Sequence, residues 1–354
     1  MNFRLKKILQ TIVFLSTGII ILYLVYYKQN QAYQAECALQ GIAAEDCSLI
    51  NKVYEDFLKS DFRILLLVLM LYFLSNISRA LRWNMLLKTF GVRPRFINSF
   101  MSIMLGYFAN LGLPRVGELI RAATLARYEK IKVDKVMGTV IIDRAMDVIL
   151  ILIVIAMALA GASTKLIAFL KENSDLSGKI SALMSHPLVW VAGTTLLLVT
   201  LFLLRSKKVR ASVFGQKIYN FIKGMIDGLK SIAELDKPWL FIFHSVFIWV
   251  MYYLMLYIGF SAFAPTAHLG LMAGLVVFTM GSIGFVIPSP GGMGTYHFLV
   301  IAALLMYGVN GADGFSFANI MFFTINVFAN ILFGLLALII LPAINTTYKQ
   351  SLDD

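Results

Sequence analysis

Charged residues recur at helical spacing within segments that are otherwise apolar. Residues three or four apart lie on one face of an α-helix, so they can act together as a cluster. Ionisable groups at membrane depth are costly and usually functional, and the arginine fork matches the geometry of phosphate. The candidates are Arg79 and Arg82, then Arg115, Glu118 and Arg121, and then Asp143, Arg144 and Asp147. They predict a cationic, partly neutralised pocket for an anionic head group, or else charges that neutralise one another and pin helix ends to the interface.

Two clusters of glycine and proline interrupt the apolar stretches. The first is Gly112-Leu113-Pro114, and the second is Pro288-Ser289-Pro290-Gly291-Gly292-Met293-Gly294. A helix that starts after such a turn presents free N–H donors and the positive end of its dipole, which favour an anion. Further binding candidates are therefore Pro290, Gly291, Gly292 and Gly294.

Four other polar residues stand out beside these turns or inside apolar segments. His297 follows Gly294 by three residues, and it is either a proton carrier, because its ordinary pKa is near 6.5, or a polar cap on the turn. Asn110, Asn326 and Asn330 either line a pocket or form hydrogen bonds between helices. No motif for ATP, another cofactor or a metal ion is present, so none is expected.

The composition excludes a water-soluble globular protein. The 354 residues are 59% hydrophobic and 14% charged, with a mean hydropathy of +0.80, whereas soluble domains are about 25% charged. Lys and Arg outnumber Asp and Glu by 31 to 19. These cations flank apolar segments, which is typical of loops that face anionic cytoplasmic lipid and not of nucleic-acid binding.

Apolar stretches long enough to cross a bilayer predict about six spanning helices in a single domain over residues 1–354. The first stretch is either a span or a signal peptide, and we expect a span. Basic flanks place both termini in the cytoplasm. The predicted spans are 8–27, 64 to about 82, 136–160, 187–204, 239–263 and 317–341.

Two connecting segments have a distinct character. Residues 28–63 carry an excess of acidic side chains and should form an external loop, where Cys37 and Cys47 either pair in a disulfide or remain free thiols. Residues 205–237 are strongly basic with apolar residues at helical spacing. They predict an amphipathic helix on the cytoplasmic surface.

Two further apolar regions are expected to enter the membrane and leave by the same face. Residues 97–113 have basic segments on both sides, and residues 294–306 are too short to cross. The fold class predicted is therefore an all-α polytopic membrane protein with two re-entrant hairpins, arranged as an inverted repeat of residues 8–160 and 187–341. Inverted repeats with broken helices are typical of alternating-access transporters, although both clusters could also be ordinary turns between spans.

With these residues in view, the chain resembles the transmembrane region of the lysylphosphatidylglycerol synthase/flippase family from about residue 59 to 341. Four landmarks carry the resemblance: residues 79–83, 110–121, 143–147 and 288–294. The resemblance implies movement of an anionic, aminoacylated or polyprenyl lipid between leaflets. His297 stands where the family often has an acidic residue. The soluble aminoacyl-transferase domain of the full-length synthases is lacking, so lipid aminoacylation by this chain is not expected.

The leading hypothesis is therefore a lipid translocator in a bacterial cytoplasmic membrane, with anionic lipids as its partners and no enzymatic activity. One alternative is a membrane-embedded transferase acting on lipid-linked substrates, with Asp143, Asp147 and His297 as acid/base groups. Another is a scaffold that docks a partner membrane enzyme through residues 209–235. A homo-oligomer is compatible with each of them.

Overall fold

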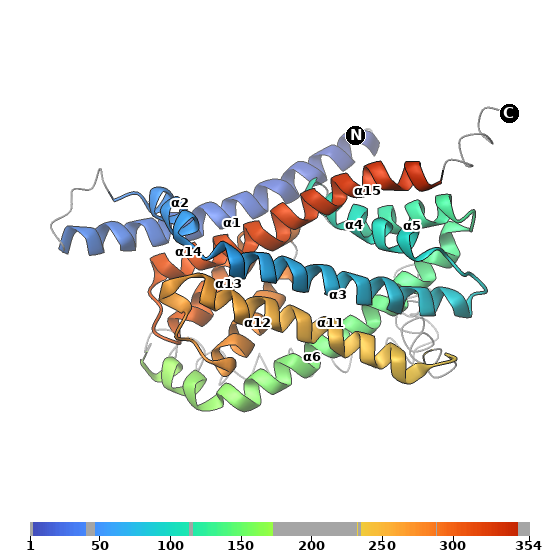
Figure 1. The fold of residues 1–354 in the computed structure, drawn as a ribbon. Helices are drawn as coiled ribbons and strands as arrows, with labels where there is room; N and C mark the ends of the chain where they lie inside the picture. The colour runs from blue at the N-terminus through green and yellow to red at the C-terminus, as the bar shows by residue number, and fades with distance from the viewer. Residues whose placement is uncertain are drawn as a thin grey trace, which may run out of the picture.

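The computed structural model of the chain describes residues 3–39, 47–112, 116–172, 232, 235–287 and 289–345. This part of the chain is built from helices (Figure 1). Four of them are long and apolar enough to cross a membrane. The protein is therefore a polytopic membrane protein, and the predicted span at 187–204 and most of the amphipathic segment at 205–237 lie outside the described residues.

The long helices largely follow the predicted spans. They are α3 (Phe62–Thr89), α6 (Val133–Glu172), α11 (Pro238–Gly259) and the continuous run of α14 (Gly311–Phe322), η4 (Phe323–Ala329) and α15 (Asn330–Ile344). Asp61 caps the start of α3, because its side chain accepts a hydrogen bond from the backbone N–H of Arg63 at 2.9 Å. The last run starts at Gly311, six residues before the predicted boundary, because Asn310 caps it there through the N–H of Asp313.

The segment 28–63 is not the loop that we predicted. Helix α1 (Phe3–Leu39) continues well past the predicted end of the first span, and α2 (Leu49–Lys59) follows. Polar residues after the apolar stretch are compatible with helix once they leave the membrane, so hydropathy marks the end of the span and not the end of the helix. A disulfide joins Cys37 of α1 to Cys47 just before α2, which is one of the two alternatives that the sequence leaves open.

A partly buried cluster of charged residues links α2 to α14. Lys52 Nζ lies 2.7 Å from both Asp56 and Asp313, and Ser316 donates a hydrogen bond of 2.6 Å to Asp56. Burial alone would lower the pKa of Lys52, but the hydrogen bonds and charges of Asp313 and Asp56 outweigh it and raise the pKa above 10.5. The stabilisation is therefore complete below that ordinary value and is lost only as the pH rises through the raised pKa.

Replacing Lys52 by methionine should lower the free energy of unfolding by about 2 kcal/mol, because two carboxylates lose their shared cation. Thermal unfolding in detergent measures the effect, and the difference from wild type should stay constant between about pH 6 and 9. Lys59→Met is the matched control, since the Lys59–Glu55 pair is exposed and should contribute little. If Lys52→Met and Lys59→Met had the same midpoint of thermal unfolding, the cluster around Lys52 would not stabilise the packing of α2.

Two helical hairpins lie among the long helices. The first consists of α4 (Phe96–Gly112) and α5 (Gly117–Tyr128), and the second of α12 (Leu271–Val286) and α13 (Thr295–Leu305). At 1.5 Å per residue α5 and α13 are about 18 and 17 Å long, which is too short to cross a hydrocarbon core of about 30 Å. The second helix of each hairpin could therefore not cross a membrane alone.

The hairpins enter the bundle from opposite ends (Figure 1). The start of α4 lies beside the end of α15, because Asn98 and Asn345 exchange hydrogen bonds of 3.2 and 2.9 Å. The start of α12 lies at the other end of the bundle, where the N–H of Asp61, at the start of α3, donates to the carbonyl of Ala262 at 2.9 Å. The end of α4 and the turn η3 (Pro290–Gly292) of the second hairpin therefore meet inside the bundle from opposite ends.

Helix α3 has one face buried against other helices and one exposed face. It packs along α11 and also contacts α4, α6 and η4. Its buried face carries both apolar side chains and two arginines, which is unusual for a spanning helix. The largest fully buried side chains of the described residues include Trp83, Arg82, Arg121, Phe241, Phe260 and Phe317.

Candidate functional site

Charged side chains from α3, α5 and α6 meet in one network. Asp143 of α6 lies at its centre, fully buried, and pairs with Arg82 at 2.6 Å, Arg121 at 3.1 Å and Arg79 at 3.4 Å. Asp147, one turn further along α6, pairs with Arg82 at 2.8 Å and Arg79 at 2.9 Å. The spacing of three on α3 and four on α6 brings these pairs onto facing sides, as the sequence predicts.

The network continues from its buried centre to two partly exposed residues, Glu118 and Arg144. Glu118 of α5 lies 3.0 Å from Arg121 Nε and 2.5 Å from Arg144 Nη2, and Arg144 also lies 3.3 Å from Asp147. The guanidinium of Arg121 stacks on the ring of Trp83 at 4.7 Å, which is a favourable cation–π distance. Trp83 in turn donates to Thr139 at 2.9 Å, so a second helix fixes its ring.

The charges in this network do not cancel. Among the described residues, four guanidinium groups face three carboxylates, which leaves one positive charge in excess. The network lies deep in the bundle, because Arg79 is ten residues before the end of α3, or about 15 Å along the axis. A buried cationic excess favours an anionic ligand.

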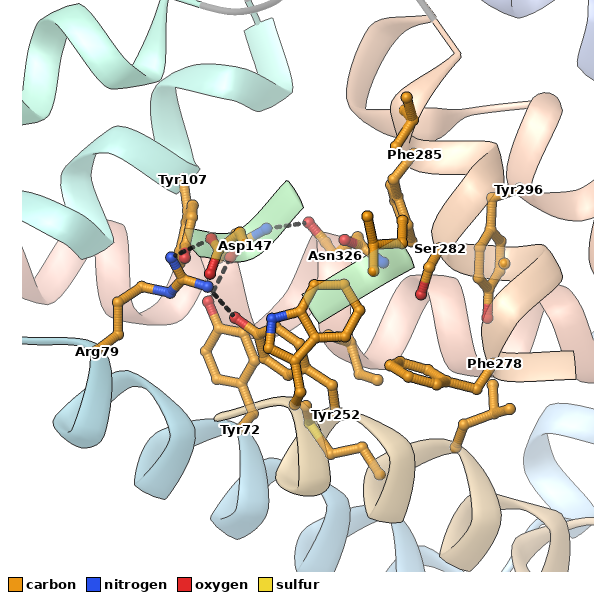
Figure 2. A pocket seen from close by; sticks show the side chains of 18 of the residues that line it. Tyr72, Arg79, Tyr107, Asp147, Tyr252, Phe278, Ser282, Phe285, Tyr296 and Asn326 are labelled. Carbon is orange, nitrogen blue, oxygen red and sulfur yellow. Dashed lines mark hydrogen bonds and ion pairs between the residues drawn. The ribbon is translucent and has the colours of Figure 1, made fainter. Parts of the chain in front are cut away.

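A cavity of about 500 Å³ opens beside the network, between α3, α6, α11, α12 and η4. Arg79, Arg144 and Asp147 supply its charged end, and the rest of the wall is mainly aromatic and aliphatic. Figure 2 shows Arg79 bonded to Asp147 and Tyr252 on one side, and Phe278, Ser282 and Tyr296 on the other. The first cavity therefore has a charged end and an apolar body, which suits an amphiphile.

A second cavity of about 460 Å³ lies between the facing ends of α4 and α5 and the turn of the second hairpin. Its wall is more polar, with Asn110 and Glu118 from the first hairpin and Ser289, Gly291 and Gly292 from the second. The two cavities share Tyr107, Arg144, Phe285, Asn326 and Asn330. They therefore adjoin, and Arg144 is the charged residue common to both.

The first cavity has lipid-facing residues on its wall. Val148 of α6 is 47% exposed, and Phe285 and Val286 of α12 are 42% and 62% exposed. In a membrane protein, exposed apolar side chains at this depth face hydrocarbon. The side of the cavity between α6 and α12 is therefore apolar and exposed.

The turn of the second hairpin depends on glycine. Gly291, Gly292 and Gly294 have φ values of +54°, +79° and +81°, a region that other residues adopt at a cost. A Cβ at Gly294 would also lie 2.7 Å from the backbone nitrogen of Leu22 in α1. Thr295 holds the turn closed by donating to the carbonyl of Gly284 at 2.7 Å, so the peptide groups of Gly291 and Gly292 line the second cavity.

The described residues include most of the predicted site. Arg79, Asp147, Arg144, Glu118 and Asn110 line one or both cavities, whereas Arg82, Arg121 and Asp143 support them from behind. Asn110 also accepts a hydrogen bond of 2.8 Å from the N–H of Gly117, so it links the two helices of the first hairpin. The backbone of Pro290 belongs to the second turn, η3 (Pro290–Gly292). Arg115 lies outside the described residues.

His297 lies apart from the charged network. It is 1% exposed, and its ring packs against those of Phe322 at 4.8 Å, Tyr296 at 5.6 Å and Phe315 at 6.3 Å. It lines neither of the two cavities. This environment supports neither of the two predicted roles, a proton carrier or a polar cap on the turn, because the ring packs among aromatic rings and its Nδ1 has no hydrogen-bond partner among the described residues.

Sequence reasoning missed the aromatic wall of the first cavity. The wall includes Tyr72, Tyr107, Trp249, Tyr252, Phe278 and Tyr296. One signal was available, because Tyr72 precedes Arg79 by seven residues, or two helical turns, and so shares its face. The π-helix η4 had no signal in the sequence, and its wider turn places Asn326 on the cavity wall while Asn330 accepts a hydrogen bond of 2.6 Å from Tyr72.

Among the described residues, no group of three His, Cys, Asp or Glu side chains is placed to hold a metal ion. The fold and site thus define a multi-pass membrane protein with buried charges beside paired cavities. A family model, the lysylphosphatidylglycerol synthase TM region, matches residues 48–342. The chain belongs to this family, and none of the comparisons matched a transferase domain in it.

Two curated relatives come from archaea. The chain is 28% identical over 119 residues to a UPF0104 membrane protein of Pyrococcus horikoshii, which covers 32% of this chain and 36% of the relative. It is 26% identical over 101 residues to a UPF0104 membrane protein of Methanocaldococcus jannaschii, covering 28% and 30%. Each match thus spans about a third of the curated relative. No solved structure matches the chain.

Proposed function

We propose that this protein moves a lipid with a phosphate-bearing head group between the leaflets of the membrane. The observation that carries the proposal is the first cavity, which joins a charged end at Arg79, Arg144 and Asp147 to an apolar body beside the lipid. The head group of a lipid can occupy the charged end while the acyl chains of that lipid remain in the hydrocarbon core of the membrane. Membrane regions of this family are linked to lipid flipping, which agrees with the proposal.

The excess positive charge favours an anionic over a neutral head group. Arg79 and Arg144 both line the first cavity, so their guanidinium groups bring N–H donors to its charged end. Phosphate oxygens are well matched to these donors because the arginine fork can bind two of them at once.

The opposed hairpins supply a route for alternating access. The facing ends of α4 and α5 and the turn of the second hairpin line the second cavity from opposite ends of the bundle. We interpret them as corresponding parts of an inverted repeat of residues 8–160 and 187–341, in which the substrate site lies near the membrane midplane. In this proposal the basic end of the bundle and both termini face the cytoplasm, and the membrane is the bacterial cytoplasmic membrane.

The alternative of a transferase receives less support from the geometry. Asp143 and Asp147 are both bonded to arginines, so neither carboxylate is available as a general base. His297 lines neither cavity. The scaffold alternative depends on residues 209–235, which lie outside the described residues.

Head-group photo-cross-linking tests the proposal. Purified protein is reconstituted with a phosphatidylglycerol analogue that carries a diazirine on its head group, illuminated and digested. We expect cross-links on cavity residues of α6 and α12, such as Val148, Ser282 and Phe285, because the head group enters the first cavity. Unlabelled phosphatidylglycerol should compete for them. Cross-links confined to the ends of the spanning helices would contradict the proposal.

A further inference from the structure

Three of the four arginines in the network are fixed in place. Arg79, Arg82 and Arg121 have side chains that are 3%, 0% and 2% exposed. Each contacts at least two carboxylates and the face of an aromatic ring. Moving any of them would break several buried interactions at once.

Arg144 differs from these three in both exposure and position. Its side chain is 39% exposed, and it is the arginine that lines both described cavities. Its two carboxylate partners lie on different sides. Glu118 lines only the second cavity and Asp147 only the first, at 2.5 and 3.3 Å from the guanidinium.

Arg144 can leave either partner without leaving an unpaired charge. Glu118 keeps Arg121 at 3.0 Å, and Asp147 keeps Arg79 at 2.9 Å and Arg82 at 2.8 Å. Breaking a buried pair is expensive mainly because a charge is left uncompensated. Both carboxylates therefore remain paired with another arginine when Arg144 moves away. The guanidinium of Arg144 can turn from one cavity to the other at a low cost in free energy.

We propose that Arg144 is the gate between the two cavities, and that it passes a phosphate-bearing head group from one to the other by exchanging Glu118 for Asp147 as its partner. This inference rests on the proposed function and adds a role within it. Arg79 binds the head group in the first cavity, whereas Arg144 accompanies it between cavities. Replacing a gate residue should change the rate at which the head group passes between the cavities more than it changes how much of the head group is bound in the first cavity.

Arg144→Gln separates these two effects. We expect the cross-links in the first cavity to remain within about twofold of wild type, because Arg79 is still present, while those in the second cavity fall at least tenfold. Translocation of a fluorescent phosphatidylglycerol should also fall at least tenfold. Lys88→Gln is the matched control, because it removes an exposed ion pair with Asp236, away from both cavities, and it should behave as wild type.

Glu118→Gln provides an independent test that also holds if Arg144→Gln fails to fold. It removes the carboxylate that Arg144 binds on the side of the second cavity, so we expect the rate of translocation to fall at least threefold. Cross-linking in the second cavity should rise, because a carboxylate that competes there with phosphate for Arg144 is gone. A purely structural role for Glu118 would move neither quantity.

The outcomes distinguish the gate from the proposed function. A wild-type protein that neither moves nor cross-links the probe would overturn both. Wild-type activity with an equally active Arg144→Gln variant would overturn the gate alone. Loss of cross-linking in both cavities of the Arg144→Gln variant would show that Arg144 only binds the head group, which also contradicts the gate.

Discussion

Replacing Asp143 by asparagine should destabilise the protein by about 3–5 kcal/mol, the expected cost of removing one partner from a buried ion pair. Asparagine nearly matches aspartate in shape, so packing is preserved and the effect is electrostatic. Three buried arginines would then surround an uncharged amide, and the excess positive charge of the network would double. The midpoint of thermal unfolding in detergent measures the loss.

A second substitution makes this prediction more specific. Removing a cation as well, in the double variant Asp143→Asn/Arg82→Met, should recover part of the lost stability because it restores the original excess of one charge. Such coupling is expected for residues in one network. Additive destabilisation by the two substitutions, or an Asp143→Asn variant as stable as wild type, would show that charge balance does not hold this network together.

Replacing Ser282 by tryptophan should stop lipid movement while the protein remains folded. Ser282 lies on the wall of the first cavity, opposite Arg79 in Figure 2, so an indole there would occupy the space that the head group needs. We expect the rate of translocation to fall at least tenfold, since a filled cavity excludes the substrate. A single symmetric peak in size-exclusion chromatography would show that the fold is retained.

Leu66→Trp is the control for this variant. Leu66 belongs to α3, is 58% exposed and lines neither of the two cavities. It adds the same indole on a lipid-facing surface, where tryptophan is tolerated, and should leave translocation unchanged. Equal activity of Ser282→Trp and Leu66→Trp would mean that the lipid does not pass through the first cavity.

The charged network could be predicted from the sequence because helical spacing determines which side chains share a face. The pairs Arg79 and Arg82, and Asp143 and Asp147, meet as their spacing of three and four indicates. The different roles of the arginines in the network could not be predicted, because these roles depend on how deeply each side chain is buried. Nothing in the spacing of Arg121 and Arg144 shows that one is 2% and the other 39% exposed.

Hydropathy predicted where the chain crosses the membrane better than where its helices end. It marked the starts of α3, α6 and α11 to within three residues, yet α6 continues twelve residues past its predicted end at 160. Residues 28–63, predicted as a loop, contain the end of α1 and all of α2. The aromatic wall of the first cavity was hidden for a similar reason. Tyrosine and tryptophan are common in apolar segments, and only packing shows that Tyr107 and Trp249, from different helices, face the same space.

The most direct test of the central claim is the rate at which a fluorescent phosphatidylglycerol becomes accessible to dithionite in proteoliposomes that contain the wild-type protein. The account predicts a rate well above that of protein-free vesicles and of vesicles with Ser282→Trp, and a slower rate for the corresponding phosphatidylcholine. Wild-type protein that is folded and yet no faster than Ser282→Trp with either lipid would contradict the claim that the first cavity carries lipid head groups across the membrane.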